Sequence, residues 1–134
     1  MHHPWRDLRN REHVRLYFEH MPPGMRGGTN GTDIWMEKRL LQVERRCTLT
    51  HELVHMDLGH EGCQDERTEA RVRRATARRL LTVNQLVEVV RWTDIPEEMA
   101  DELWVTVDVL TEFVRSLTPF ERKLVDHAWR RANG

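Results

Sequence analysis

The chain has 134 residues, of which 32% are charged and 39% hydrophobic, and its formal net charge is −1. This length is enough for one domain that buries a hydrophobic core without a disulfide framework. The charge balance provides no overall basic field for binding nucleic acid, and the sequence contains no apolar run near the roughly 20 residues of a membrane span.

The N-terminal part of the chain is predicted to form a small antiparallel sheet. Residues 14–19 alternate apolar and polar side chains, which is the pattern of a half-buried strand. A segment rich in glycine and proline then leads to Asn30 and Gly31, a pair typical of the turn in a β-hairpin. Ile34 and Met36 continue the alternation beyond this turn and indicate a further strand.

Two longer helices are expected after the sheet. From about Lys38 the apolar residues recur with the period of a helix, and Gly59 is placed to end it. The sequence "GHEGCQD" then indicates a turn, after which Asp65 can cap a second helix over residues 66–81. These two helices would therefore be neighbours in the fold.

The rest of the chain is expected to form short helices. Residues 86–92 form an apolar stretch, and Asp94 and Thr118 each begin a pattern typical of a capping box. Between them, residues 97–117 indicate a helix, a tight turn and another helix. The second of these helices carries a net acidic set of polar side chains, whereas a helix that reads DNA would carry basic ones. We therefore expect this segment to pack on the core or on a protein partner.

Together these elements predict an α+β fold. A small N-terminal antiparallel sheet would pack on the first long helix, with a core over residues 1–85 and a helical C-terminal lobe over residues 86–134 that contains the helix-turn-helix-like segment. The polar N-terminal segment lacks the apolar region of a signal peptide, and Cys47 and Cys63 suit a reducing compartment. We therefore expect a cytoplasmic protein.

The segment His51-Glu52-Leu53-Val54-His55 matches the motif H-E-x-x-H. On a helix, positions i and i+4 share one face, so both imidazoles can reach a single ion. Glu52 can contact a water on that ion without displacing it, which suits a general base. The pattern also arises by chance on ordinary helices, but an amphipathic helix with apolar residues in the x positions favours a metal site.

A catalytic zinc ion needs three protein ligands besides water, so a third ligand must come from elsewhere. Glu66 and Glu69 lie three residues apart on the next predicted helix, and either could turn toward the two histidines. We favour Glu69 because it is followed by small residues that would let the helices pack closely, namely Ala70, Ala75 and Ala77. The alternatives are Cys63 as a ligand, or glutamates that only pair with nearby arginines in solvent.

A protease would need two further features, and the sequence offers candidates for both. The strand over residues 32–36 could hold an extended substrate as an edge strand. His60 and Tyr17 are candidates for stabilising negative charge on the substrate oxygen. The alternative for His60 is a histidine favoured at a helix end by the helix dipole.

The stretch "IWMEKRLLQVERRCTLTHELVHMDLGH", followed by "ERTEARVRRATARRLL", resembles the ImmA/IrrE metallo-endopeptidases, in particular short members encoded by actinobacterial phages. The resemblance covers roughly residues 14–117. It implies that His51, His55 and Glu69 match the zinc-ligand positions of these zincin-like proteins and that Glu52 matches the catalytic glutamate. The chain departs from the family after that glutamate, where residues 72–76 are VRRAT in place of the usual A-N-x-F-A.

The resemblance implies a zinc-dependent endopeptidase that cleaves a regulatory protein. In phages and mobile elements the target is typically a helix-turn-helix repressor, whose loss switches genes on. A phage-encoded member would act in the cytoplasm of the host cell. The alternative is a non-catalytic regulator of the same fold that acts by protein–protein binding. Binding to membranes is not expected, and direct binding to nucleic acid is not expected either.

Overall fold

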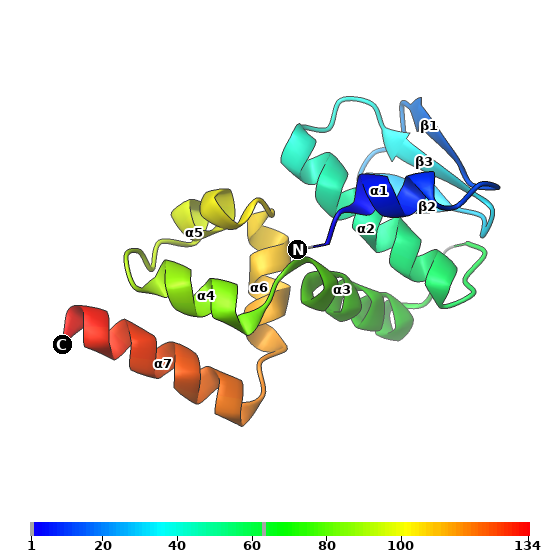
Figure 1. Ribbon diagram of the computed structural model, residues 1–134. Helices are drawn as coiled ribbons and strands as arrows, with labels where there is room; N and C mark the ends of the chain where they lie inside the picture. The colour runs from blue at the N-terminus through cyan, green and yellow to red at the C-terminus, as the bar shows by residue number, and fades with distance from the viewer. Residues whose placement is uncertain (1, 63) are drawn as a thin grey trace.

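The computed structural model describes residues 2–62 and 64–134 and has the expected α+β fold (Figure 1). The sheet lies on one side of the molecule with the first two helices, and the last four helices form the other side. In chain order the elements are α1 Pro4–Arg9, β1 Arg15–Glu19, β2 Gly27–Thr29, β3 Asp33–Glu37, α2 Gln42–Asp57, α3 Glu66–Leu80, α4 Val83–Val90, α5 Pro96–Leu103, α6 Val107–Arg115 and α7 Pro119–Asn133.

The sheet is mixed, so the prediction of an antiparallel sheet is only partly correct. Strands β2 and β3 form the predicted antiparallel hairpin around Gly31, whose φ is +95°. Strand β1 pairs with β3 in parallel, with Leu16 opposite Ile34, and the order is β1-β3-β2. Alternation of side chains identified the buried face of β3, with Ile34 and Met36 both 0% exposed, but in β1 Phe18 is exposed against expectation. Alternation also contains no information about which strands become neighbours or in which direction they run.

The strand order corrects the expected role of residues 32–36. Strand β3 lies in the middle of the sheet with a partner on each side, so it cannot accept a further strand. Strand β2 lies at an edge instead, next to α2. An added peptide strand could therefore pair only with β1 or β2, and of these β2 is the edge strand that lies beside α2.

One face of the sheet packs on α2 and forms a small apolar cluster. Ile34 and Met36 from β3 and Leu49 and Leu53 from α2 are all 0% exposed. Burying each of these side chains contributes about 1.5–3 kcal/mol relative to leaving it in water. Helix α1 covers the side of this cluster through partly buried Trp5 and other apolar residues. The cluster fixes the orientation of α2 and hence of the motif that it carries.

A larger apolar cluster joins the C-terminal helices and is centred on Phe113, which is 0% exposed. It also includes Cys47 from α2 and Leu80 and Leu81 from the end of α3. The cluster thus contains residues from both sides of the domain boundary expected at residue 85. That boundary stays a prediction.

Helices α5 and α6 form the predicted helix, tight turn and helix. The turn is made at Trp104, whose φ of +58° is in the left-handed region. The buried guanidinium of Arg46 on α2 donates a hydrogen bond to the Trp104 carbonyl at 2.6 Å. Helix α6 packs on α3. The segment therefore lies against the core, as expected from its acidic second helix.

Of the two predicted capping boxes, one is confirmed and one is wrong. Thr118 caps α7 and accepts the amide N–H of Glu121. Asp94 does not cap α5, because that helix begins one residue later than the pattern requires, at Pro96. Its carboxylate instead accepts the indole N–H of Trp129 on α7 at 3.2 Å, a contact between residues far apart in sequence.

No helix in residues 2–62 and 64–134 has the length and apolarity that crossing a membrane requires.

The pH dependence of stability tests the ion pair between Arg78 on α3 and Glu121 on α7. The Arg78 guanidinium, and then the amide N–H of Thr118, hold the pKa of Glu121 at about 2, below its ordinary value of 4.5. A lowered pKa in the folded state stabilises the protein above pH 4.5, and this contribution is lost as the pH falls toward 2. We expect Glu121→Gln to lower the free energy of unfolding in urea equally at pH 7 and pH 5, and by less at pH 3. A deficit that is the same at all three values would contradict this.

Candidate metal centre

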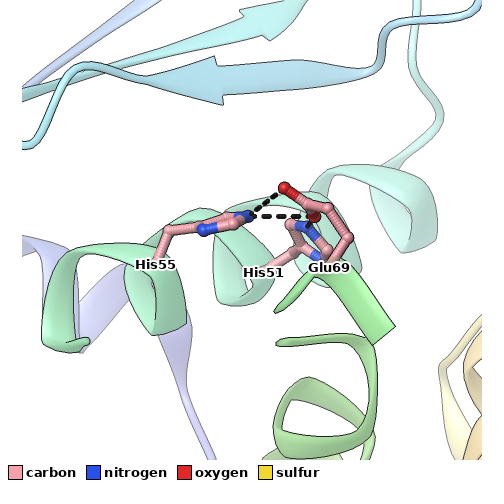
Figure 2. Close-up of side chains that lie close together, drawn as sticks. All are labelled: His51, His55 and Glu69. Atoms are coloured by element: carbon pink, nitrogen blue, oxygen red, sulfur yellow. Dashed lines mark hydrogen bonds and ion pairs between the residues drawn. The ribbon is translucent and has the colours of Figure 1, made fainter. Parts of the chain in front are cut away.

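Three side chains from two helices meet between α2 and α3 (Figure 2). The Nε2 atom of His51 lies 3.4 Å from a carboxylate oxygen of Glu69, and the Nε2 atom of His55 lies 3.2 Å from Glu69. The nearest ligand atoms of the three residues all lie within 4.8 Å of one another. Within residues 2–62 and 64–134 this is the one group of His, Cys, Asp or Glu side chains that is close enough to hold a metal ion.

These separations suit a small divalent cation. Nitrogen and oxygen ligands lie about 2.0–2.2 Å from zinc, so two of them at a tetrahedral angle are separated by about 3.4 Å. The two distances to Glu69, 3.4 and 3.2 Å, are already close to that value. Two imidazoles and one carboxylate also match the donor set of known catalytic zinc sites. The residues therefore fit the metal that the sequence predicts.

The local sequence explains how the three residues meet. Leu49 and Leu53 anchor α2 to the sheet, which leaves the face with the two histidines toward α3. The Asp65 side chain caps α3 by accepting the amide N–H of Thr68 at 2.8 Å. This cap sets the start of α3, so that Glu69 falls one turn into the helix and faces the histidines.

The structure brings Glu69, and not Glu66, next to the two histidines. The Glu66 side chain is 79% exposed and pairs with Arg73 on the same helix. The reason given for preferring Glu69 holds only in part, because Ala75 is exposed. Of the three alanines Ala77 is 0% exposed, and the other buried side chains of α3 include Val72 and Thr76. The alternative ligand Cys63 lies outside the described residues.

The site is partly shielded from water, and this burial favours the neutral form of His51. His55 is only 4% exposed, whereas His51 and Glu69 are half-buried. Burial, and then the nearby His55 ring, lower the pKa of His51. A neutral imidazole has a lone pair available for a metal, so burial prepares the His51 ring as a ligand.

Glu52 lies next to this group and is itself buried, with 5% of its surface exposed. Burial raises the pKa of its carboxyl to about 8, and the negative charge of Glu69 adds to the effect. The side chain extends toward β2, because a Cβ atom built on Gly27 would lie 3.5 Å from a Glu52 carboxylate oxygen. A buried carboxyl with a raised proton affinity beside a metal site is a candidate proton carrier.

Two hollows open beside the three-residue group. One has a volume of about 460 Å³ and extends to α6, where Val109 forms part of its wall; we call it the α6 hollow. The other has a volume of about 320 Å³ and extends along Gly28 and Thr29; we call it the β2 hollow. His51 and Glu52 border both. The candidate metal centre therefore lies where two pockets meet.

The two candidates for stabilising charge on a substrate oxygen are not placed for that role. Tyr17 lies on β1, stacks on Trp35 at a ring separation of 5.7 Å, and lines neither hollow. His60 lies behind the site, where its Nδ1 atom is 2.9 Å from the Nδ1 atom of His55.

Sequence reasoning missed Arg73, which lines the α6 hollow and lies one helical turn beyond Glu69. That spacing of four residues was the signal that could have identified it.

Comparison of the chain with family models, with curated proteins and with solved structures gave no match. The resemblance to the ImmA/IrrE family therefore rests on the motif and on the residues that precede and follow it.

The ligand assignment can be tested by titrating the metal-free protein with Zn²⁺ in the presence of a competing chelator. We expect wild type to bind one ion. His51→Ala, His55→Ala and Glu69→Ala should each weaken zinc binding more than the loss of a residue that only supports a ligand does. Loss of such a supporting residue typically weakens binding by about 10- to 100-fold. Glu66→Ala, three residues from Glu69 on the same helix, should leave the affinity unchanged. Equal losses for Glu66→Ala and Glu69→Ala would refute the assignment.

Proposed function

We propose that the chain is a zinc-dependent endopeptidase of the ImmA/IrrE type that cleaves a regulatory protein, such as a phage or mobile-element repressor of the helix-turn-helix class. The observation that carries the proposal is the placement of buried Glu52 beside the group formed by His51, His55 and Glu69. A site that only held the fold together would need the three ligands but no further buried carboxyl beside them.

In the proposed reaction, His51, His55 and Glu69 would hold a zinc ion. When bound, the ion would supply Lewis acidity for the scissile carbonyl and for the attacking water. Glu52 would accept a proton from the attacking water as a general base and would then give it to the leaving amine as a general acid. Its burial favours the protonated form, so the carboxyl can hold the proton between the two steps.

The edge strand β2 is the proposed binding surface for an extended peptide. In an antiparallel pair the main-chain groups alternate in direction, and those of Gly27 and Thr29 face away from β3. A peptide can therefore add to the sheet as a further strand. Gly27 also lets β2 approach α2, because a Cβ atom there would lie 2.9 Å from the Thr48 methyl group and 2.8 Å from the Trp35 carbonyl oxygen.

We propose that the α6 hollow receives an apolar side chain of the substrate next to the scissile bond. Its inner wall includes Cys47 and Thr76, which are 6% and 2% exposed, together with Val109. Two ion pairs border it, formed by Arg26 with Asp108 and by Arg73 with Glu112. An apolar floor with a charged border favours a side chain such as Leu or Met over a charged one. In this proposal α6 contributes to substrate selection and not to reading DNA.

Replacing Glu52 with Gln separates catalysis from metal binding. We expect cleavage to fall by about 10²- to 10⁴-fold because the proton carrier is lost. The zinc affinity should persist, because Glu52 is not a ligand. The assay incubates the chain with a candidate helix-turn-helix repressor from the same genome and detects fragments by mass spectrometry. If wild type binds zinc and the repressor without cutting it, the chain is instead a non-catalytic regulator.

Replacing Val109 with Trp tests the role of the α6 hollow. The larger side chain should fill the hollow and lower kcat/KM for repressor cleavage by at least about 10-fold. A 10-fold loss corresponds to about 1.4 kcal/mol of lost transition-state binding. The zinc affinity should be unchanged. Val107→Trp is the matched control, since Val107 lies on the same helix and borders neither hollow. Equal activity of both variants and wild type would exclude the hollow from substrate binding.

A further inference from the structure

At the end of α2 the chain turns back, so that His60 lies beside His55 of the last helical turn. Gly59 adopts a φ of +77°, and its amide N–H donates to the Met56 carbonyl at 3.0 Å. The amide N–H of His60 donates to the carbonyl of His55, also at 3.0 Å. These two bonds form a Schellman motif. In this motif the second residue after the C-cap, here His60, bonds to the residue five positions earlier, here His55. The main chain of His60 is thereby held against His55.

The side chains of these two histidines meet as well. Their Nδ1 atoms are 2.9 Å apart, which is hydrogen-bond distance, and their ring centres are 5.1 Å apart. The opposite nitrogen of His55, Nε2, faces Glu69 at 3.2 Å. The two nitrogens of His55 therefore have separate partners, one inside the candidate metal centre and one behind it.

When His55 binds a metal, only one assignment of hydrogens to the ring nitrogens of His55 and His60 is possible. A neutral imidazole has a single N–H, and Nε2 must give its lone pair to the ion, so the hydrogen of His55 lies on Nδ1. The Nδ1–H group then donates to Nδ1 of His60, which must present a lone pair. The hydrogen of His60 accordingly lies on its own Nε2.

The loop that carries His60 is held in place from the other side. Gly31, in the β2–β3 turn, lies so close that a Cβ atom there would be 3.1 Å from Glu61 Cγ and 3.5 Å from the His60 carbonyl oxygen. The turn is braced by the Asn30 side chain, which accepts the amide N–H groups of Thr32 and Asp33. The hairpin thus packs on the His60–Glu61 segment and limits its movement.

We propose that His60 is a positioning residue that fixes the tautomer and the ring orientation of His55 for metal binding. The inference rests on the metal site of the proposed function. Metal-binding histidines in proteins generally donate their other N–H to a carboxylate, a carbonyl or water, and loss of such a partner weakens metal affinity by about 10- to 100-fold. Here the acceptor is a neutral imidazole, supplied by the helix end itself.

Two substitutions of His60 distinguish the effect of its hydrogen-bond acceptor atom from the effect of the size of its ring. His60→Phe keeps an aromatic ring but removes the acceptor atom, so zinc affinity measured by chelator competition should fall by about 10- to 100-fold. His60→Asn keeps an acceptor oxygen near the position of Nδ1, so its affinity should remain close to that of wild type. A general packing effect would give the opposite order, with His60→Asn the weaker binder.

The tautomer provides a second readout on the same proteins. Long-range ¹H–¹⁵N NMR spectra of the zinc-loaded wild type should show His55 protonated at Nδ1 and His60 protonated at Nε2. Wild-type affinity in His60→Phe, or a zinc-loaded wild type with His60 protonated at Nδ1, would overturn the inference. If the wild type binds zinc but does not cleave the repressor, the proposed function fails while both readouts still test His60. A wild type that binds no zinc overturns both.

Discussion

The candidate metal centre depends on one polar contact between α2 and α3, in which the Glu69 carboxylate lies against the imidazoles of His51 and His55. His55 is 4% exposed, and a buried polar group without a partner costs about 1–3 kcal/mol. Glu69 satisfies that ring nitrogen in the protein alone. A cation between the three side chains would satisfy all of them together, so metal binding and the packing of the two helices are thermodynamically linked.

A single rigid helix carries most of the site. Leu53 holds α2 to the sheet, His55 faces α3, and Glu52 borders both hollows beside β2. Because these residues belong to one helix, their relative positions are set by helical geometry alone. Only Glu69 must be brought from elsewhere, and the Asp65 cap sets where its helix begins. The C-terminal helices add one wall of the α6 hollow.

Local sequence signals predicted much of this structure, and contacts between distant residues account for what they missed. Helical period located α2 and α3, and the spacing of the motif, with Glu69 favoured on the next helix, identified the residues that meet. The parallel pairing of β1 could not be predicted, because alternation describes a strand's faces and not its neighbour. Asp94 resembles a cap locally but bonds to Trp129. The α6 hollow depends on how the C-terminal helices fold back onto α3, which no local pattern encodes.

The central claim is that one divalent ion is held by two histidines of α2 and a glutamate of α3. It is tested most directly by a crystal structure of the chain grown with Zn²⁺, with anomalous data collected at the zinc absorption edge. We expect one strong peak about 2.0–2.2 Å from Nε2 of His51, Nε2 of His55 and a carboxylate oxygen of Glu69. A peak held by other residues, or three side chains that stay together with no zinc between them, would contradict it.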